Sequence, residues 1–94
     1  MKNDSMNLVS IARKVWKEGD VAGALSSLED PALLGNPEAQ FLAGEIHYNN
    51  QNWGSALNSF RRCLQLDSNQ VAAQTYVDLI LNILGFFHTD QFNP

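Results

Sequence analysis

The sequence has little or nothing of several features that define large classes of proteins. It has a single cysteine, Cys63, which excludes an intramolecular disulfide and is typical of a reducing compartment. It has no run of about 18 apolar residues, so we expect no membrane-spanning helix and no membrane partner. The first residues, Met-Lys-Asn-Asp-Ser, are not followed by the apolar segment of a secretory signal peptide. We therefore expect a cytoplasmic protein.

Positive charge is also scarce. Six Lys and Arg residues stand against ten Asp and Glu residues, which gives a net charge of −4. A surface that binds phosphate groups needs the opposite sign, so we expect no nucleic-acid partner. A weak alternative stays open, because Arg13 and Lys17 lie near aromatic residues of the kind that stack on bases.

Motifs for catalysis and cofactor binding are absent as well. There is no glycine-rich phosphate loop, and His47, His88 and Cys63 do not have the spacing of a metal site. A nucleophilic Cys63 would need His47 beside it and a third group to orient the pair. The sequence favours a small buried residue at Cys63 and a hydrogen-bonded core histidine at His47. We expect no metal, no cofactor and no enzymatic activity.

What the sequence does contain is a helical hairpin in residues 36–67. Asn36 can cap a helix, Pro37 suits the first helical position because it has no N–H to satisfy, and Glu38 suits the positive helix end. The polar residues 49–52 predict a turn in the middle of the segment. This pattern is typical of two helices joined by a short loop.

Gly44, inside the first of these helices, costs about 1 kcal/mol relative to alanine. We expect that it allows the second helix to approach closely at the small Ala56. Gly44, Ala56 and Phe60 fall at motif positions of the tetratricopeptide repeat, a helix–turn–helix unit of about 34 residues, so the segment resembles that family. Other motif positions hold different residues here: Gln40, Ala43, His47 and Ser68.

Weaker copies of this hairpin flank it. A shift of 32 residues places Trp16 on Tyr48, and a shift of 34 residues places Val77 on Ala43. The expected parts are a first hairpin (5–30), the second hairpin (36–67), a terminal helix (69–85) and a tail (86–94), within one tetratricopeptide-like domain (1–94). The expected fold is all-α with five helices. The resemblance implies that they wind into a short right-handed α-solenoid, followed by an aromatic C-terminal tail.

Local signals also mark where these helices begin and end. Gly19 is expected to end the first helix and Asp20 to cap the second. Pro31 stops the second helix, because the residue before a proline avoids the helical conformation. Gly85 follows the terminal helix as Gly19 follows the first.

The terminal helix has more apolar surface than one packing contact covers. Leu79 and Ile83 lie off the stripe that predicts its buried face. The tail adds Phe86, Phe87 and Phe92. We expect the tail, a second copy of the chain or a partner to cover this surface, and a frayed tail is the alternative. The stripe itself consists of Ala73, Val77, Ile80, Leu81 and Leu84.

The resemblance also implies a concave recognition groove, lined by the first helix of each hairpin and by the terminal helix. Trp16, Phe41 and Tyr48 would form its aromatic floor, which suits an amphipathic helix or an extended peptide with large apolar anchors. The alternative is that these rings complete a thin core. The expected groove residues are Val9, Arg13, Trp16, Lys17, Phe41, Glu45, Tyr48, Asn49, Leu79 and Ile83.

Two functions follow from these expectations. The first is a protein–protein interaction module, an adaptor whose groove binds a peptide or an amphipathic helix of an unidentified protein. The alternative is a self-assembling, homodimeric structural unit that uses the apolar last helix and the tail.

Overall fold

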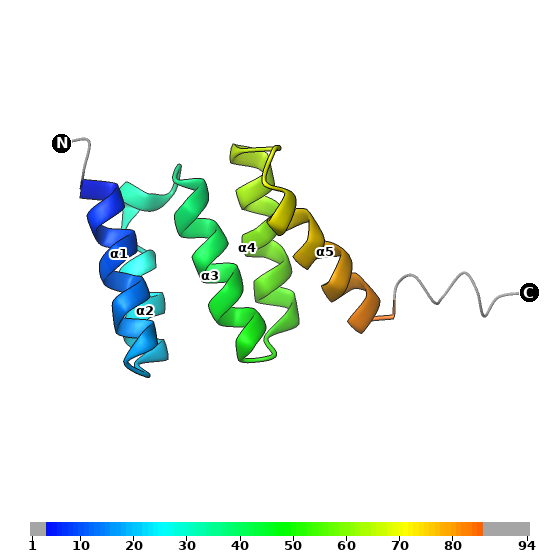
Figure 1. The fold of residues 1–94 in the computed structure, drawn as a ribbon, viewed down its shortest axis with the longest axis horizontal. Helices are drawn as coiled ribbons and strands as arrows, with labels where there is room; N and C mark the ends of the chain where they lie inside the picture. The colour runs from blue at the N-terminus through cyan, green and yellow to red at the C-terminus, as the bar shows by residue number, and fades with distance from the viewer. Residues whose placement is uncertain (1–3, 86–94) are drawn as a thin grey trace, which may run out of the picture.

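The computed structural model describes residues 4–85, and this part of the chain contains five α-helices, one short 3₁₀ helix and no strand (Figure 1). The predicted all-α fold with five helices is confirmed. Phe86, Phe87 and Phe92 of the predicted tail lie outside the described residues. No described helix combines the length and the apolar character needed to span a bilayer. The elements are α1 (Asp4–Lys17), α2 (Val21–Leu28), η1 (Pro31–Leu33), α3 (Pro37–Asn49), α4 (Trp53–Leu66) and α5 (Val71–Ile83).

Polar side chains begin two of these helices. Asn36 Oδ1 accepts hydrogen bonds from the backbone N–H groups of Glu38 (2.9 Å) and Ala39 (3.2 Å) at the start of α3. Asp20 Oδ1 accepts one from the N–H of Gly23 (2.8 Å) at the start of α2. Both predicted caps are confirmed. Each one satisfies N–H groups that have no partner inside the helix.

Three described residues have a backbone with positive φ. Gly19 follows α1 with a φ of 96°, and Gly85 lies beyond α5 with a φ of 84°. Glycine adopts this conformation without the steric cost of a side chain. Gln51, in the turn between α3 and α4, has a φ of 62°, which is unfavourable for a residue with a Cβ atom. The turn at residues 49–52 is therefore tight but not built on glycine.

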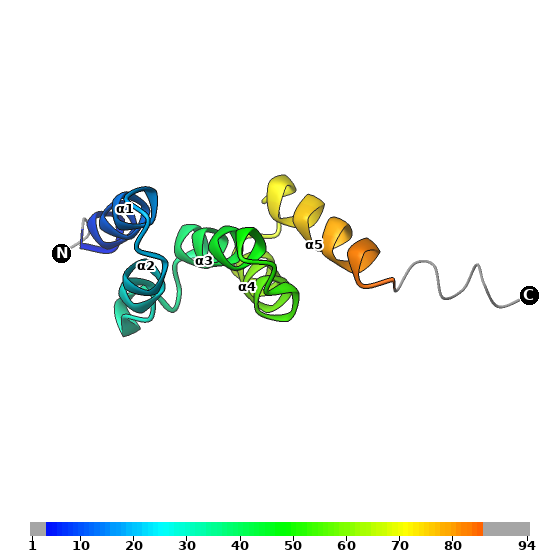
Figure 2. The ribbon, with the colours of Figure 1, turned by 90° about the horizontal axis from the view of Figure 1, so that it is seen from below.

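The helices lie side by side in the order of the sequence (Figure 1). α1 packs against α2, α3 packs against α4, and α5 packs against α4, while α3 also contacts both helices of the first pair. Seen from below, the first helix of each pair lies on one side and the second helix on the other (Figure 2). α3 is therefore the central element of the row.

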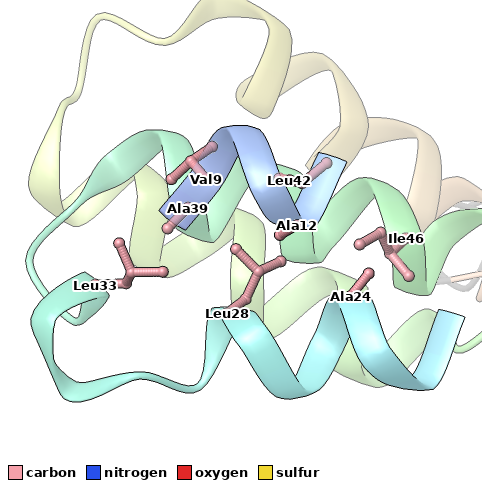
Figure 3. Packing of buried hydrophobic residues seen from close by; sticks show 8 residues of the cluster. All are labelled: Val9, Ala12, Ala24, Leu28, Leu33, Ala39, Leu42 and Ile46. Atoms are coloured by element: carbon pink, nitrogen blue, oxygen red, sulfur yellow. The ribbon is translucent and has the colours of Figure 1, made fainter. Parts of the chain in front are cut away.

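Buried side chains form two clusters, one on each side of α3. The N-terminal core consists of Val9, Ala12, Ala24, Leu28, Leu33, Ala39, Leu42 and Ile46 (Figure 3). The C-terminal core consists of Ala56, Leu57, Phe60, Cys63, Ala73, Val77 and Ile80. Phe41 and Tyr48 of α3 pack against the second cluster. Because α3 is covered on both sides, its apolar residues lie on more than one of its faces.

Gly44 does allow a close contact with α4. A Cβ atom at this position would lie 2.7 Å from the ring of Phe60, which is completely buried. The ring of Phe60 occupies the space that a side chain at position 44 would need. A bulky neighbour that the sequence analysis did not predict therefore explains this glycine.

Candidate functional site

The expected groove residues do not all lie at an accessible surface. Val9 is only 6% exposed and belongs to the N-terminal core, so its assignment to a groove is corrected. Trp16 is half-buried and packs against the same core. Phe41 and Tyr48, also half-buried, pack against the C-terminal core. The structure therefore brings Phe41 and Tyr48 together and assigns Trp16 to a different cluster.

Phe41 and Tyr48 belong to an aromatic cluster centred on Tyr76 of α5. The Tyr76 ring stacks on the Phe60 ring, with centroids 4.5 Å apart and planes 5° apart. It makes T-shaped contacts with Phe41 at 5.8 Å and Tyr48 at 4.9 Å. Trp53 adds a T-shaped contact to Tyr48 at 5.2 Å. Ring pairs of this kind contribute about 0.5–1.5 kcal/mol each beyond their buried area, so the cluster holds α5 against α3 and α4.

Beside this cluster, the carboxylate of Glu45 on α3 lies near groups of two other helices. It approaches the hydroxyl of Tyr76 on α5, and the positive charge of Arg13 on α1 acts on its pKa. Burial is the larger effect and raises the pKa of Glu45 above its ordinary value, although Arg13 and Tyr76 act to lower it. Burial, followed by the charge of Glu45, raises the pKa of Tyr76. The structure thus brings together one residue from each of α1, α3 and α5.

The two ends of this surface differ in chemistry. On α5, Leu79 and Ile83 are 43% and 47% exposed. Asn49 is exposed at the end of α3, where its side-chain amide donates to the carbonyl of Glu45 at 2.9 Å. A basic end lies on α1, formed by Ser10, Arg13, Lys14 and Lys17 around a shallow hollow. We define the α1–α3–α5 face as Arg13, Lys14, Lys17, Glu45, Tyr48, Asn49, Tyr76, Leu79 and Ile83.

Tyr76 is the main residue of this face that the groove positions did not predict. A signal was present in the sequence, because Tyr76 lies three residues after Ala73 and four before Ile80, on the stripe expected to face the second hairpin. The groove positions on this helix were Leu79 and Ile83 instead. Helical periodicity was the better guide here, since it reports which side of α5 is covered.

The residues considered for catalysis are placed as follows. Cys63 is fully buried, as predicted, and burial together with the charge of Asp67 raises the pKa of its thiol. His47 is half-buried, but its Nδ1 atom is buried without a hydrogen-bond partner, so the predicted hydrogen-bonded histidine is corrected. Burial, and then the charge of Arg62, lowers the pKa of His47. Among the described residues, no group of three or more His, Cys, Asp or Glu side chains could hold a metal ion.

Comparison of the chain with protein-family models, with curated proteins and with solved structures finds no match. The geometry and chemistry of the α1–α3–α5 face are therefore the basis for assigning a function.

Proposed function

We propose that the protein is a tetratricopeptide-like interaction module, a short right-handed α-solenoid in the cytoplasm that acts as an adaptor and not as an enzyme. Its α1–α3–α5 face binds an amphipathic helix or an extended peptide of a partner protein. The observation that supports this proposal is the position of Glu45 on α3, which lies beside Tyr76 of α5. Burial raises the pKa of Glu45, and the charge of Arg13 on α1 acts to lower it. Residues from three helices that are far apart in the sequence therefore share one surface, as a peptide-binding groove requires.

The chemistry of this face defines the kind of partner. Arg13 and Lys17 at the α1 end attract acidic side chains, which favours encounter and orientation. Leu79 and Ile83 at the α5 end offer exposed apolar area for large apolar anchors. Glu45 between them favours a basic or hydrogen-bond-donating group at the centre of the ligand. The expected ligand is a segment that is acidic at one end and apolar at the other.

Selection of peptides from a random displayed library, followed by NMR titration of the full chain, tests this proposal. We expect the selected peptides to shift the backbone amide signals of α1, α3 and α5. Arg13→Glu and Leu79→Asp should each weaken binding by about tenfold or more, because one reverses a charge and the other removes an apolar contact.

Two exposed residues on the other side of the molecule provide matched controls. Ser26→Glu on α2 and Asn58→Asp on α4 change the charge of the chain without touching the α1–α3–α5 face. Both should leave the affinity unchanged. Peptides that shift mainly α2 and α4, or that bind the Arg13→Glu and Leu79→Asp variants as tightly as the wild type, would contradict the proposal.

A second candidate function is self-assembly, and the exposed side of α5 favours it. Four large apolar side chains are exposed on this helix and directly after it. Their exposed fractions are 77% for Val71, 43% for Leu79, 47% for Ile83 and 40% for Leu84. A second copy of the chain that packs on this side would bury them and form a homodimer.

A further inference from the structure

A hollow of about 310 Å³ lies between α2 and α4 and against α3. α2 and α4 lie on the opposite side of the row from α1 and α5 (Figure 2). Part of the wall of the hollow is apolar and consists of Leu25 and Leu28 of α2, Leu34 of the following connection and Ala43 of α3. The volume lies at the lower end of the range of small-molecule sites, which begins at about 300 Å³. The hollow is therefore large enough for a small ligand with a hydrocarbon body.

Polar side chains from α3 and α4 form the rest of the wall. Arg62 Nε donates a hydrogen bond to Gln40 Oε1 at 3.0 Å, and Arg62 Nη2 donates one to Ser59 Oγ at 3.4 Å. Gln40 and Ser59 are 7% and 1% exposed, whereas Arg62 is exposed. Both acceptors are neutral and do not compensate the charge of the guanidinium, which stays accessible to a ligand.

The ring of His47 completes the wall of the hollow. Its Nδ1 atom is buried and is out of reach of a ligand in the hollow. Burial, and then the charge of Arg62, lowers the pKa of His47. Arg62 is therefore the cationic group of this wall that can pair with a negative charge.

A larger hollow, of about 530 Å³, lies between the connection before α3 and the connection before α5. Two of its polar side chains already bind backbone N–H groups. Asn36 caps α3, and Asp67 Oδ1 accepts from the backbone N–H of Asn69 at 3.1 Å. The smaller hollow is the better candidate for an anionic ligand, because it is lined by the cationic Arg62, whereas the larger one is lined by the acidic Glu38 and Asp67.

We propose that the hollow between α2 and α4 binds a small apolar carboxylate, a molecule of about ten non-hydrogen atoms with a single negative charge. The carboxylate accepts hydrogen bonds from the guanidinium of Arg62, and the hydrocarbon body contacts the apolar wall. Glu29, at the edge of the hollow, repels a ligand with two negative charges, and the apolar wall disfavours inorganic phosphate. This site is independent of the α1–α3–α5 face.

A pair of matched ligands tests the charge requirement. The full chain is titrated at pH 7 with 3-phenylpropionate and, separately, with the neutral 3-phenylpropanamide, and backbone amide shifts are followed by NMR. We expect a dissociation constant on the order of 1 mM for the carboxylate and at least about tenfold weaker binding of the amide. The shifts should be confined to α2, α3 and α4 around the hollow. Equal binding of the two ligands, or shifts elsewhere, would overturn the proposal.

Variants of the protein test the site itself. Arg62→Gln should weaken binding of 3-phenylpropionate by about tenfold or more, whereas Arg61→Gln, an exposed neighbour that does not line the hollow, should have no effect. Because Arg62→Gln also leaves Gln40 without its partner, a second variant is needed. Ala43→Leu fills the hollow and removes no polar group, so it should abolish binding in a chain that stays folded by circular dichroism. Unchanged binding by Ala43→Leu would show that the ligand does not enter the hollow.

Discussion

At the scale of single residues, Gly44 and Glu45 have surroundings that are formed by other helices. Rules based on neighbours in the sequence do not predict these surroundings. Gly44 lies against a buried ring, although glycine is a poor residue for a helix interior. Glu45 carries a carboxyl group in a partly buried place, where burial outweighs the attraction of Arg13. Substitutions at these positions should therefore change stability in the direction set by the tertiary contact.

Gly44→Ala is expected to lower the free energy of unfolding by about 1–2 kcal/mol, although alanine favours a helix by about 1 kcal/mol. The added methyl group would lie 2.7 Å from the Phe60 ring, which is stacked on Tyr76 and cannot move freely. Gly54→Ala in α4 is the matched control, because no atom lies within 4 Å of its Cβ position. It should leave the stability unchanged or raise it slightly. Urea denaturation followed by circular dichroism measures both, and a stabilised Gly44→Ala variant would contradict the packing.

Glu45→Gln should become more stable relative to the wild type as the pH rises from 4 to 7. Folding raises the pKa of Glu45 above its ordinary value of 4.5, so the native state holds this proton more tightly than the unfolded chain does. The wild type therefore loses stability as the pH increases from 4.5 through the raised pKa, and the glutamine variant does not.

Urea denaturation at several pH values between 4 and 7 measures this difference. Glu38→Gln is the control, because Glu38 is exposed in the first turn of α3, where its negative charge suits the helix end. That variant should lose stability at pH 7. A difference between Glu45→Gln and the wild type that stays constant with pH would contradict the effect of burial on Glu45.

At the scale of elements, α3 and α5 differ in how much of their surface is covered by other helices. α3 is covered on both sides, by the N-terminal core and by the aromatic cluster. α5 is covered on one side only, where Tyr76 contacts Phe41, Tyr48 and Phe60. The attachment of α5 to the rest of the molecule therefore depends strongly on one aromatic residue.

Tyr76→Ala is expected to destabilise the protein by about 3–4 kcal/mol, because it removes three ring contacts and leaves a cavity. Its effect should be local. Amide hydrogen exchange should show the largest loss of protection in α5 and a smaller one in α1 and α2. Tyr76→Phe is the control, since it keeps the ring and removes only the hydroxyl that approaches Glu45. Equal loss of protection in all five described helices would contradict this view of α5.

At the scale of the whole molecule, apolar residues remain exposed at both ends of the row of helices. Ile11 of α1 is 52% exposed, and Ile83 of α5 is 47% exposed. The end at α5 has more such residues, with Val71, Leu79 and Leu84 beside Ile83. If the chain forms a homodimer, as the second candidate function requires, α5 is the expected interface.

Size-exclusion chromatography with light scattering, over a hundredfold range of protein concentration, tests this dimer. We expect the mass to rise towards twice that of the chain, and Ile83→Lys to keep it at the monomer value. Ile11→Lys is the matched control, because it places the same charge on an equally exposed isoleucine at the other end. A wild-type chain that stays monomeric at every concentration would remove self-assembly as a function.

Much of the fold could be predicted from the sequence, because helices are specified by local patterns. Asn36 and Asp20 cap helices through bonds to residues two or three positions away, and Gly19 has the positive φ expected after a helix. The site could be predicted only in part. Val9 occupies a groove position by its spacing, yet α1 turns that position into the core.

The sequence by itself determined the number of helices and nearly all of their bounds, and it predicted the burial of Ala73, Val77 and Ile80 by their helical spacing, although Leu84 of the same stripe is 40% exposed. Only the tertiary structure decided which side chains meet across helices: Phe60 against Gly44, Tyr76 against Glu45, and Arg62 with Gln40. The physical reason is the separation along the sequence of the residues that interact. Caps and turns depend on neighbours within about four residues, whereas contacts between helices depend on how the helices cross and rotate against each other. That arrangement results from the packing of all five described helices together.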